Sequence, residues 1–451
     1  MKPTRRTTLS LLGAGAATLG LPRAAWSEPG ITKDKIILGS FLPLQSGLAA
    51  GATQMKEGCD AYFKSINESG GVNGRKIEWI VENDSYNPQQ TAAVVKKLVD
   101  RDDVFALVST LGTVTAVAVL PFLAQRGVPI VNPAGGHMLL NKPTDKNVFG
   151  ILPMSSEIGE SMAEFAVTKL GAKRIAIFFQ NDQFGKDQRD GAVAALKKLN
   201  MEPVAEASYV PSDVDVSAQA VAIKQGDPEV VILGVIPKHG ALFVKEAQRL
   251  GWKPKMVGHN TVADPVVLDL AGAEALEGVY VNLMTAVDSM DTPAVKKANE
   301  ILARYYPQTK PGYYPYLGMA GGIIIVEAMK RAGSDLTRAK LISSLEGLGH
   351  FEPGVLPPID WSASYHGGPK SFGYAQWKSG KVVVLQGWQW MAPRVAAFER
   401  LRALRQCIEP DVSIKNTTFA RGRLAGWTAT LPINPCSGRA IPCKLRSNSL
   451  F

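Results

Sequence analysis

KIILGSFLPLQSG, residues 35–47, is the first segment of this chain that indicates its fold class. Its apolar run Ile36-Ile37-Leu38-Gly39 is typical of a strand that is buried on both faces, and the residues after it form a loop rich in small side chains. A helix is predicted through residues 58–63 and ends at Ser69-Gly70-Gly71. A buried strand followed by a loop and a helix indicates a parallel α/β sheet.

The same order of elements continues along the chain and then recurs. Strands are predicted at 76–82, 104–108 and 128–130, with a helix at 89–101. After residue 170 a second series follows, with strands at 174–179, 204–209 and 229–233 and helices at 186–199 and 216–224. Two such series predict an α/β protein with two doubly wound parallel-sheet lobes.

The order changes near residue 279. A strand is predicted at 278–281, followed by helices at 293–305, 316–332 and 337–346. Residues 372–377 and 382–385 flank Lys378-Ser379-Gly380 and predict a hairpin. The pattern of residues by itself does not assign these later elements to either lobe.

The net charge is concentrated at the two ends of the chain. The 451 residues carry 50 basic and 40 acidic side chains, a formal charge of +10. Residues 1–27 contribute +4 and residues 391–451 contribute +7, so the intervening body is −1. A neutral body gives no basic surface for phosphate contacts, and we expect no nucleic-acid partner.

Both terminal segments differ from the body. Residues 1–27 combine a basic start, a 13-residue apolar run at 9–21 and small residues near Ala25, which predicts a signal peptide and export to the periplasm. Arg5-Arg6 within it resembles a twin-arginine signal. Residues 391–451 have no strand alternation, and they predict an atypical, largely disordered basic tail or a non-homologous end.

The motifs of several enzyme classes are absent from the sequence. No phosphate-binding P-loop, Gly-x-Ser-x-Gly elbow or His-Glu-x-x-His occurs. The histidines are scattered, so we expect solvated loop residues and no metal site; Cys59 is expected to be a small buried hydrophobe. No cofactor is predicted, and an enzyme is disfavoured.

Four loops rich in small and hydroxyl residues follow predicted parallel strands. They contain Gln45-Ser46-Gly47, Thr110 to Thr115, Asn132 to Gly136, and Asn181 to Gly185. Ligands of open α/β sheets bind beyond the carboxyl ends of the strands, where free helix amides suit a carboxylate. Each loop alone is equally compatible with helix capping, but the four together favour a binding cleft.

Seven segments in this order resemble the type I periplasmic solute-binding proteins of ABC transporters, in the branched-chain amino-acid binding group. The resemblance covers roughly residues 33–385. The matching segments are Gly39 to Gly47, Gly70-Gly71-Val72-Asn73-Gly74-Arg75-Lys76-Ile77, Gly127 to Ile130, Asn181 to Lys186, Leu268 to Gly272, Gly278 to Val281 and Gln376 to Lys381.

The resemblance implies a periplasmic binding protein type I fold, in which a three-strand hinge joins the two lobes. The first lobe would comprise residues 33–149 and 279–350, and the second 150–278 and 351–390. Such a protein closes on a small solute and delivers it to the membrane permease and ATPase subunits of an ABC transporter. A receptor or regulator of the same fold, sensing an amide or an acid, is the alternative.

The resemblance also implies a set of ligand-binding residues. Thr113 falls where the family places a serine hydroxyl on the ligand carboxylate, and Gly136 falls where a hydroxyl is usual, so that only backbone donors would remain there. Phe184 replaces a tyrosine that covers the ligand. The full predicted set is Ser46, Thr113, Thr115, Ala134, Gly135, Gly136, Phe184, Ile236, Pro237 and Asn260.

Two departures from the family pattern bear on the ligand. Asn260 stands near the position of the family's glutamate that pairs with the ligand ammonium, and Ile236-Pro237 replace a turn that contains tyrosine. A neutral amide does not provide the charge-assisted bond that a buried ammonium needs. We therefore expect a ligand that keeps the carboxylate but lacks the amino group, such as an aromatic or aliphatic acid.

Overall fold

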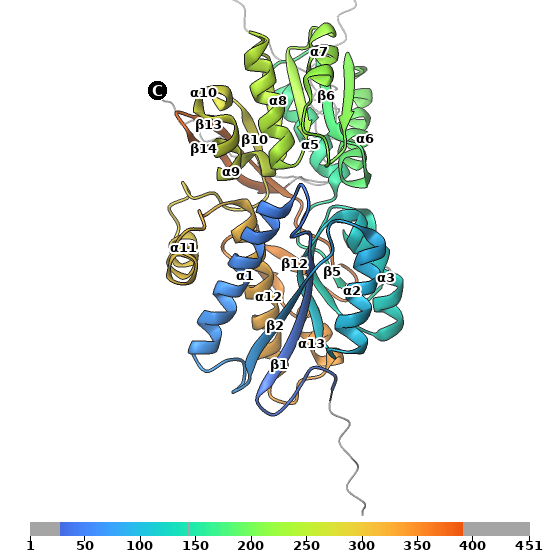
Figure 1. The fold of residues 1–451 in the computed structure, drawn as a ribbon, viewed down its shortest axis with the longest axis vertical. Helices are drawn as coiled ribbons and strands as arrows, with labels where there is room; N and C mark the ends of the chain where they lie inside the picture. The colour runs from blue at the N-terminus through green and yellow to red at the C-terminus, as the bar shows by residue number, and fades with distance from the viewer. Residues whose placement is uncertain (1–27, 142–144, 391–451) are drawn as a thin grey trace, which may run out of the picture. The chain divides into compact units, whose positions relative to one another are not determined.

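The computed structural model describes residues 28–141 and 145–390, and these residues form two parallel-sheet lobes (Figure 1). The predicted signal peptide and the predicted basic tail, with Cys407, Cys436 and Cys443, lie outside the described residues. Within the described residues the predicted order of strands and helices is confirmed, and so is the α/β fold class.

The first lobe is built on a five-stranded parallel sheet of order β2-β1-β3-β4-β5. Helices α1 and α12 cover one face of this sheet, and α2 and α3 cover the other (Figure 1). Its strands are β1 (Lys35–Leu42), β2 (Lys76–Asn83), β3 (Ala106–Leu111), β4 (Ile130–Ala134) and β5 (Val148–Phe149). Its helices are α1 (Ala49–Glu68), α2 (Pro88–Asp100), α3 (Thr113–Arg126), α4 (Met138–Asn141), α11 (Pro293–Tyr305), α12 (Tyr313–Ala332) and α13 (Arg338–Glu346).

The second lobe is built on a seven-stranded sheet of order β14-β13-β10-β9-β8-β6-β7. The strands are β6 (Ile175–Gln180), β7 (Ala205–Tyr209), β8 (Val230–Gly234), β9 (Lys255–Gly258), β10 (Tyr280–Leu283), β13 (Ser371–Lys378) and β14 (Lys381–Trp390). The helices are α5 (Ser155–Thr168), α6 (Gln183–Lys198), α7 (Ser217–Gln225), α8 (Pro237–Arg249), α9 (Pro265–Ala271) and α10 (Ala273–Leu276), with the 3₁₀ turn η1 (Asn260–Ala263).

Strand β6 shows why both faces of the second sheet are covered. Ile175 and Ile177 pack with residues of α5 and α6, whereas Ala176 and Phe178 pack with residues of α7 and α8. Successive side chains of a strand point to opposite faces, so a continuous apolar run requires an apolar partner on each side. The predicted hairpin is the antiparallel pair β13 and β14.

The chain passes between the lobes three times. It leaves the first lobe after β5 and returns after β10. It leaves again only before β13, because β11 (Gly349–Phe351) pairs with β12 (Ile359–Trp361) and the Gly368 N–H still donates to Asn141 Oδ1 of the first lobe at 3.1 Å. The prediction that residues from 351 onward belong to the second lobe is therefore wrong for residues 351–368. Strand β10 pairs with β9 and β13 of the second sheet. The predicted return near Val279 is therefore one strand too early, because an apolar strand fits either sheet and only its pairing assigns it.

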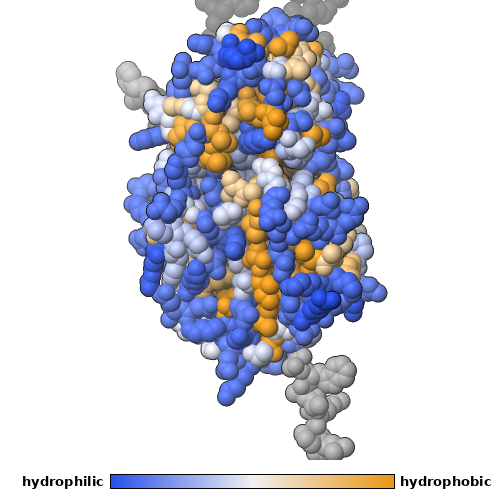
Figure 2. Space-filling model, in the orientation of Figure 1, coloured by the Kyte–Doolittle hydropathy of each residue, from blue (hydrophilic) through white to orange (hydrophobic). Residues whose placement is uncertain are grey.

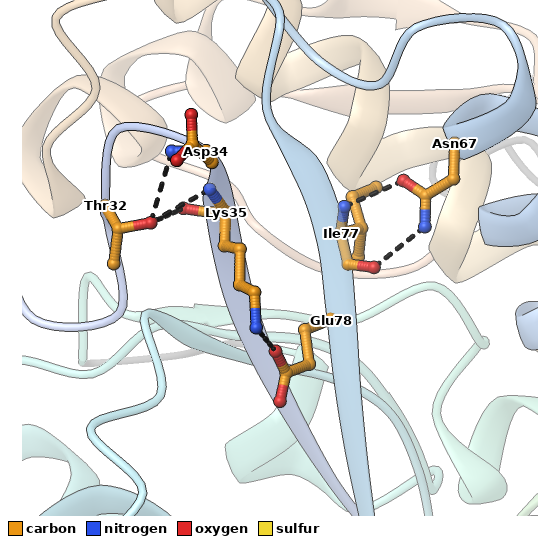
Figure 3. A network of polar contacts seen from close by, with 6 residues as sticks. All are labelled: Thr32, Asp34, Lys35, Asn67, Ile77 and Glu78. Carbon is orange, nitrogen blue, oxygen red and sulfur yellow. Dashed lines mark hydrogen bonds and ion pairs between the residues drawn. The ribbon is translucent and has the colours of Figure 1, made fainter.

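Polar contacts at the start of the first sheet join its edge strand to α1 (Figure 3). The Asn67 side chain donates to the Ile77 carbonyl and accepts from the Ile77 N–H, both at 2.8 Å. On the neighbouring strand, Lys35 Nζ lies 2.8 Å from Glu78 Oε2. The Asn67 bonds occupy backbone groups of the edge strand that would otherwise be open to pairing with another chain.

The visible surface of the molecule is mainly hydrophilic (Figure 2). Among the residues that the structure describes, no helix has both the length and the apolar content that crossing a bilayer requires. Cys59 is fully buried, as predicted. The histidine prediction is wrong for His239, His259 and His366, which are buried because each packs against an aromatic ring.

Candidate functional site

A cavity lies where the two lobes meet, with about 40 Å³ open to the centres of water molecules and about 500 Å³ of empty space in all. Its first-lobe wall comes from the loops after β3 and β4 and from the start of α12, and its second-lobe wall comes from the starts of α5 and α6 and the loops after β8 and β9. The lining residues are Leu48, Tyr86, Leu111, Gly112, Thr113, Ala134, Gly135, Gly136, Leu152, Ser155, Ile158, Phe184, Ile236, His259, Thr261, Tyr313 and Tyr314. This is the carboxyl edge of both parallel sheets, where ligands of such folds bind.

Direct contacts between the lobes enclose this cavity. The Tyr86 hydroxyl donates to Asp182 Oδ2 across the interface at 3.0 Å. Leu48, which precedes α1, packs into the apolar core of the second lobe. The structure therefore has the lobes closed on each other.

The turn that presents Tyr86 has an unusual backbone. Ser85 and Tyr86 have φ values of 52° and 60°, in the left-handed region that residues other than glycine rarely adopt. The buried Asp84 carboxylate holds the turn, since Oδ1 accepts from the Tyr86 N–H at 3.1 Å and Oδ2 accepts from the Thr91 hydroxyl at 3.0 Å. Backbone strain of this kind persists where surrounding contacts fix it, and it here places one hydroxyl across the lobe interface.

One end of the cavity lies at the first residue of α3. Thr113 is 2% exposed, and its helix has no side chain capping the free amides. The Gly112 N–H before it donates to the Ala134 carbonyl at 3.1 Å, which ties the two loops together. Unpaired amides and the positive end of the helix dipole favour an anion at this position.

A second helix begins at the same place. Ser155, the first residue of α5, is fully buried, and its N–H donates to the Gly136 carbonyl at 2.7 Å. Glu157 accepts from the Met154 N–H at 3.2 Å, as a capping carboxylate does. The Ser155 hydroxyl has no hydrogen-bond partner among the residues that the structure describes.

The second-lobe wall contains a buried histidine. His259 Nδ1 accepts from the Thr261 N–H at 3.1 Å, and the Thr261 hydroxyl donates to the Val235 carbonyl at 2.6 Å. Burial lowers the pKa of His259 to about 3. The ring is therefore neutral, and its N–H is assigned to Nε2 because Nδ1 is an acceptor. Phe184 packs edge-on against it, with ring centroids 5.3 Å apart.

The start of α12 forms the remaining side. Tyr313 and Tyr314 line the cavity, and Asp264 of the second lobe accepts from the Tyr314 N–H at 3.5 Å. Asp264 also accepts from the Val266 N–H at 3.0 Å, at the start of α9. Burial raises the pKa of Asp264 to about 6 and raises the pKa of both tyrosines further above their usual range.

The cavity lining is uncharged. Among the described residues that line it, there is no Asp, Glu, Lys or Arg, and most side chains are apolar or aromatic. A carboxylate can be held by hydroxyls and helix amides alone, whereas a buried ammonium without an anionic partner is strongly disfavoured. Nowhere in the described part of the chain do His, Cys, Asp and Glu side chains form a group that could hold a metal ion.

Six of the ten predicted site residues line this cavity, namely Thr113, Ala134, Gly135, Gly136, Phe184 and Ile236. The other four do not. Ser46 accepts from the Leu48 N–H at 3.1 Å and donates to the Pro43 carbonyl, within its own loop. The Thr115 hydroxyl donates to the Gly112 carbonyl, and Pro237 is the buried first residue of α8.

Asn260 is next to the cavity but serves the connection between the lobes. Its Oδ1 accepts from the Met284 N–H at 2.5 Å and from the Thr285 N–H at 2.9 Å, just after β10. Its neighbours His259 and Thr261 line the cavity instead. Successive residues of a turn point in different directions, so the alignment by sequence put the site one residue away from these side chains.

Other lining residues were not among those predicted. Ser155, His259, Thr261, Tyr86 and the pair Tyr313-Tyr314 all reach the cavity from segments far apart in the sequence. In the sequence, Pro311-Gly312 indicates that a helix begins after it. That signal would have placed Tyr313 and Tyr314 at a helix N-terminus, where a ligand can bind.

Comparisons with known proteins agree on one family. A family model described as "Periplasmic binding protein" matches residues 35–381. The "Leu/Ile/Val-binding protein homolog 3" of Brucella melitensis biotype 1 is 26% identical over 374 residues, covering 83% of this chain and 98% of the relative.

Solved structures show the same fold. A branched-chain amino acid ABC transporter protein of Thermus thermophilus with bound valine has a TM-score of 0.74 at 22% identity, covering 82% of this chain and all of that one. A solute-binding protein of an ABC transporter from R. palustris, in complex with benzoate, has a TM-score of 0.71 at 20% identity, covering 79% and 98%. The two structures thus share this fold while holding different carboxylates.

Proposed function

The chain belongs to the periplasmic binding protein family, and we propose that it is the extracytoplasmic solute-binding component of an ABC importer. In this role it holds a small solute between its lobes and presents it to the permease of the transporter, which the ATPase subunits drive. It acts as a carrier and not as an enzyme, in the periplasm.

The ligand that we propose is a small apolar carboxylic acid without an amino group, either aromatic or aliphatic. The observation that carries this proposal is the uncharged cavity lining, with hydroxyl-bearing residues at the starts of α3 and α5 and aromatic side chains around the rest. The carboxylate would lie at the helix ends, and the apolar part would lie between Phe184, Ile236 and Tyr313.

The binding step follows from the closed arrangement of the lobes. A ligand held by Thr113 of one lobe and covered by Phe184 of the other stabilises the closed state by contacting both. The Tyr86–Asp182 hydrogen bond forms only when the lobes approach, so it adds to the same equilibrium. One structure of this fold holds benzoate and another holds valine, so the proposed ligand class rests on the cavity lining and not on either relative.

Matched ligand pairs test the proposal by isothermal titration calorimetry. Leucine and 4-methylpentanoate differ only in the amino group, and so do valine and 3-methylbutanoate; benzoate and phenylacetate extend the panel. We expect at least one acid to bind at least about 100-fold more tightly than its amino-acid counterpart or than leucine, because a buried ammonium lacks a partner. Micromolar binding of leucine or valine, with no binding of the acids, would refute the ligand class.

The amide of the tightest acid is the control for the carboxylate. It keeps the shape but removes the negative charge, so its affinity should fall if the helix ends bind an anion. Transport itself is tested by uptake of the labelled acid into cells with and without the gene. Unchanged uptake, together with altered gene expression in response to the acid, would favour a sensing role instead.

A further inference from the structure

The Ser155 hydroxyl is a buried polar group to which the described part of the fold provides no hydrogen bond. It is fully buried, it lines the cavity, and it has no hydrogen-bond partner among the described residues. The capping contact of α5 comes from Glu157, and the Ser155 N–H is taken by the Gly136 carbonyl. Buried hydroxyls in folded proteins are nearly always hydrogen-bonded, so this one indicates a partner that binds in the cavity.

The position of Ser155 is set by a glycine. A Cβ atom placed on Gly136 would lie 2.2 Å from Ser155 Oγ and 2.6 Å from the Ser155 nitrogen. The hydroxyl of Ser155 thus occupies the space that a side chain at residue 136 would fill.

Gly135 leaves room for the first residue of α3, as Gly136 does for the first residue of α5. A Cβ atom on Gly135 would lie 3.0 Å from Thr113 Oγ1 and 2.9 Å from the Thr113 Cα. Two consecutive glycines therefore let the first residues of two helices, α3 and α5, approach one loop. Both helices are long enough to present free amides and a positive dipole end at this point.

We propose that Ser155 is a ligand-binding residue, which donates its hydroxyl hydrogen to the carboxylate of the bound acid in place of a side chain at residue 136. This inference rests on the proposed function of the cavity. The carboxylate is then held between Thr113 of α3 and Ser155 of α5, one from each lobe. Because the two residues belong to different lobes, the anion itself joins the lobes when they close.

Ser155→Ala removes the hydroxyl alone, and benzoate and 4-methylpentanoate are the probes. We expect the dissociation constant of the probe that binds to rise about tenfold, as for the loss of one hydrogen bond to a charged group. The melting temperature of the unliganded protein should stay the same or rise, because an unpartnered buried hydroxyl is lost. A role confined to folding would give the opposite pattern.

Ser161→Ala is the matched control on the same helix. Ser161 is also buried, but its hydroxyl lies 2.5 Å from the Tyr374 hydroxyl and 3.4 Å from Asn282 Nδ2. We expect this variant to lower the melting temperature and to leave the dissociation constant unchanged. The pair of variants thus separates a hydroxyl that binds the ligand from one that holds the fold.

A side chain at residue 136 tests the same contact from the loop side. Gly136→Ser should abolish binding with or without Ser155→Ala, because its Cβ would lie 2.6 Å from the Ser155 nitrogen, which no substitution at residue 155 removes. An affinity of Ser155→Ala within twofold of the unmodified protein would overturn the inference and leave the proposed function intact. An unmodified protein that binds none of the acids would contradict both.

Discussion

The buried carboxyl group of Asp264 gives a pH dependence of stability that can be worked out in advance. Asp264 is fully buried between η1, α9 and the start of α12. Burial raises its pKa from 3.8 to about 6, and hydrogen bonds from the Val266, Tyr314 and Tyr313 N–H groups offset part of that rise. In the unfolded chain the carboxyl group returns to its ordinary pKa.

The sign and size of the effect follow from these two values. Between pH 3.8 and about 6 the folded protein holds a proton that the unfolded chain has lost, so the free energy of unfolding falls as pH rises and then levels above about pH 6. The full difference corresponds to about 3 kcal/mol, since each pH unit is about 1.4 kcal/mol. Between pH 4.5 and 7.5 the ionisation of Asp264 lowers the free energy of unfolding by about 2 kcal/mol.

Asp264→Asn tests this, because the amide has the shape of the carboxyl group but does not ionise. The free energy of unfolding is measured with urea at pH 4.5 and at pH 7.5 for both proteins. We expect the difference between the variant and the unmodified protein to shift by about 2 kcal/mol in favour of the variant at the higher pH. The amide loses one acceptor for the Tyr314 N–H, and this cost of about 1 kcal/mol is the same at both pH values and cancels in the difference.

Asp215→Asn is the control, because hydrogen bonds from the Ser217 hydroxyl and N–H lower the pKa of this exposed carboxyl group. Between pH 4.5 and 7.5 this group is ionised in both the folded and the unfolded chain, so its removal should leave the difference in stability between the two pH values nearly unchanged. If the Asp264→Asn and unmodified curves run parallel between pH 4.5 and 7.5, then Asp264 ionises at its ordinary pKa in the folded protein, and the reasoning from burial fails.

Two further variants test the closed state and the packing of the first lobe. Tyr86→Phe removes the hydrogen bond to Asp182 between the lobes, and we expect the bound acid to be released about tenfold faster in stopped-flow measurements. Tyr365→Phe is the control and should not change the release rate, because its hydroxyl bonds within its own loop. Equal release rates in the two variants would contradict the closing role of Tyr86. Gly58→Ala would place a Cβ 2.0 Å from the Pro315 carbonyl oxygen, where α1 crosses α12. It should lower the free energy of unfolding, measured with urea, by about 1–3 kcal/mol. Gly387→Ala should cause no such loss, because its added Cβ meets no atom within 4 Å.

The order of strands and helices was predictable from the sequence because it depends on local patterns. Apolar runs such as 174–179 and 229–233 have the character of strands buried on both faces, and the glycine-rich segment around Gly70 to Arg75 carries the family resemblance. The sequence did not predict to which lobe β10 belongs, because the pairing of β10 with β9 and β13 is a contact between distant segments.

The edge of the sheet where the cavity lies, and much of its first-lobe wall, could be predicted from the order of residues alone. Thr113 and Ala134 to Gly136 directly follow parallel strands, and the carboxyl ends of such strands meet at one edge of the sheet whatever the rest of the chain does. This rule needs only the local order of elements.

Which side chains face that cavity from other segments depends on the packing of the folded chain. Asn260 turns its oxygen to the Met284 and Thr285 amides, so that His259 and Thr261 line the wall, and Ser155 enters the space that Gly136 leaves open. The direction of a side chain at a loop or a helix start depends on its packing against other segments, here 19 to 25 residues away along the chain. For that reason the residue spacing could identify the loop but not the hydroxyl beside it.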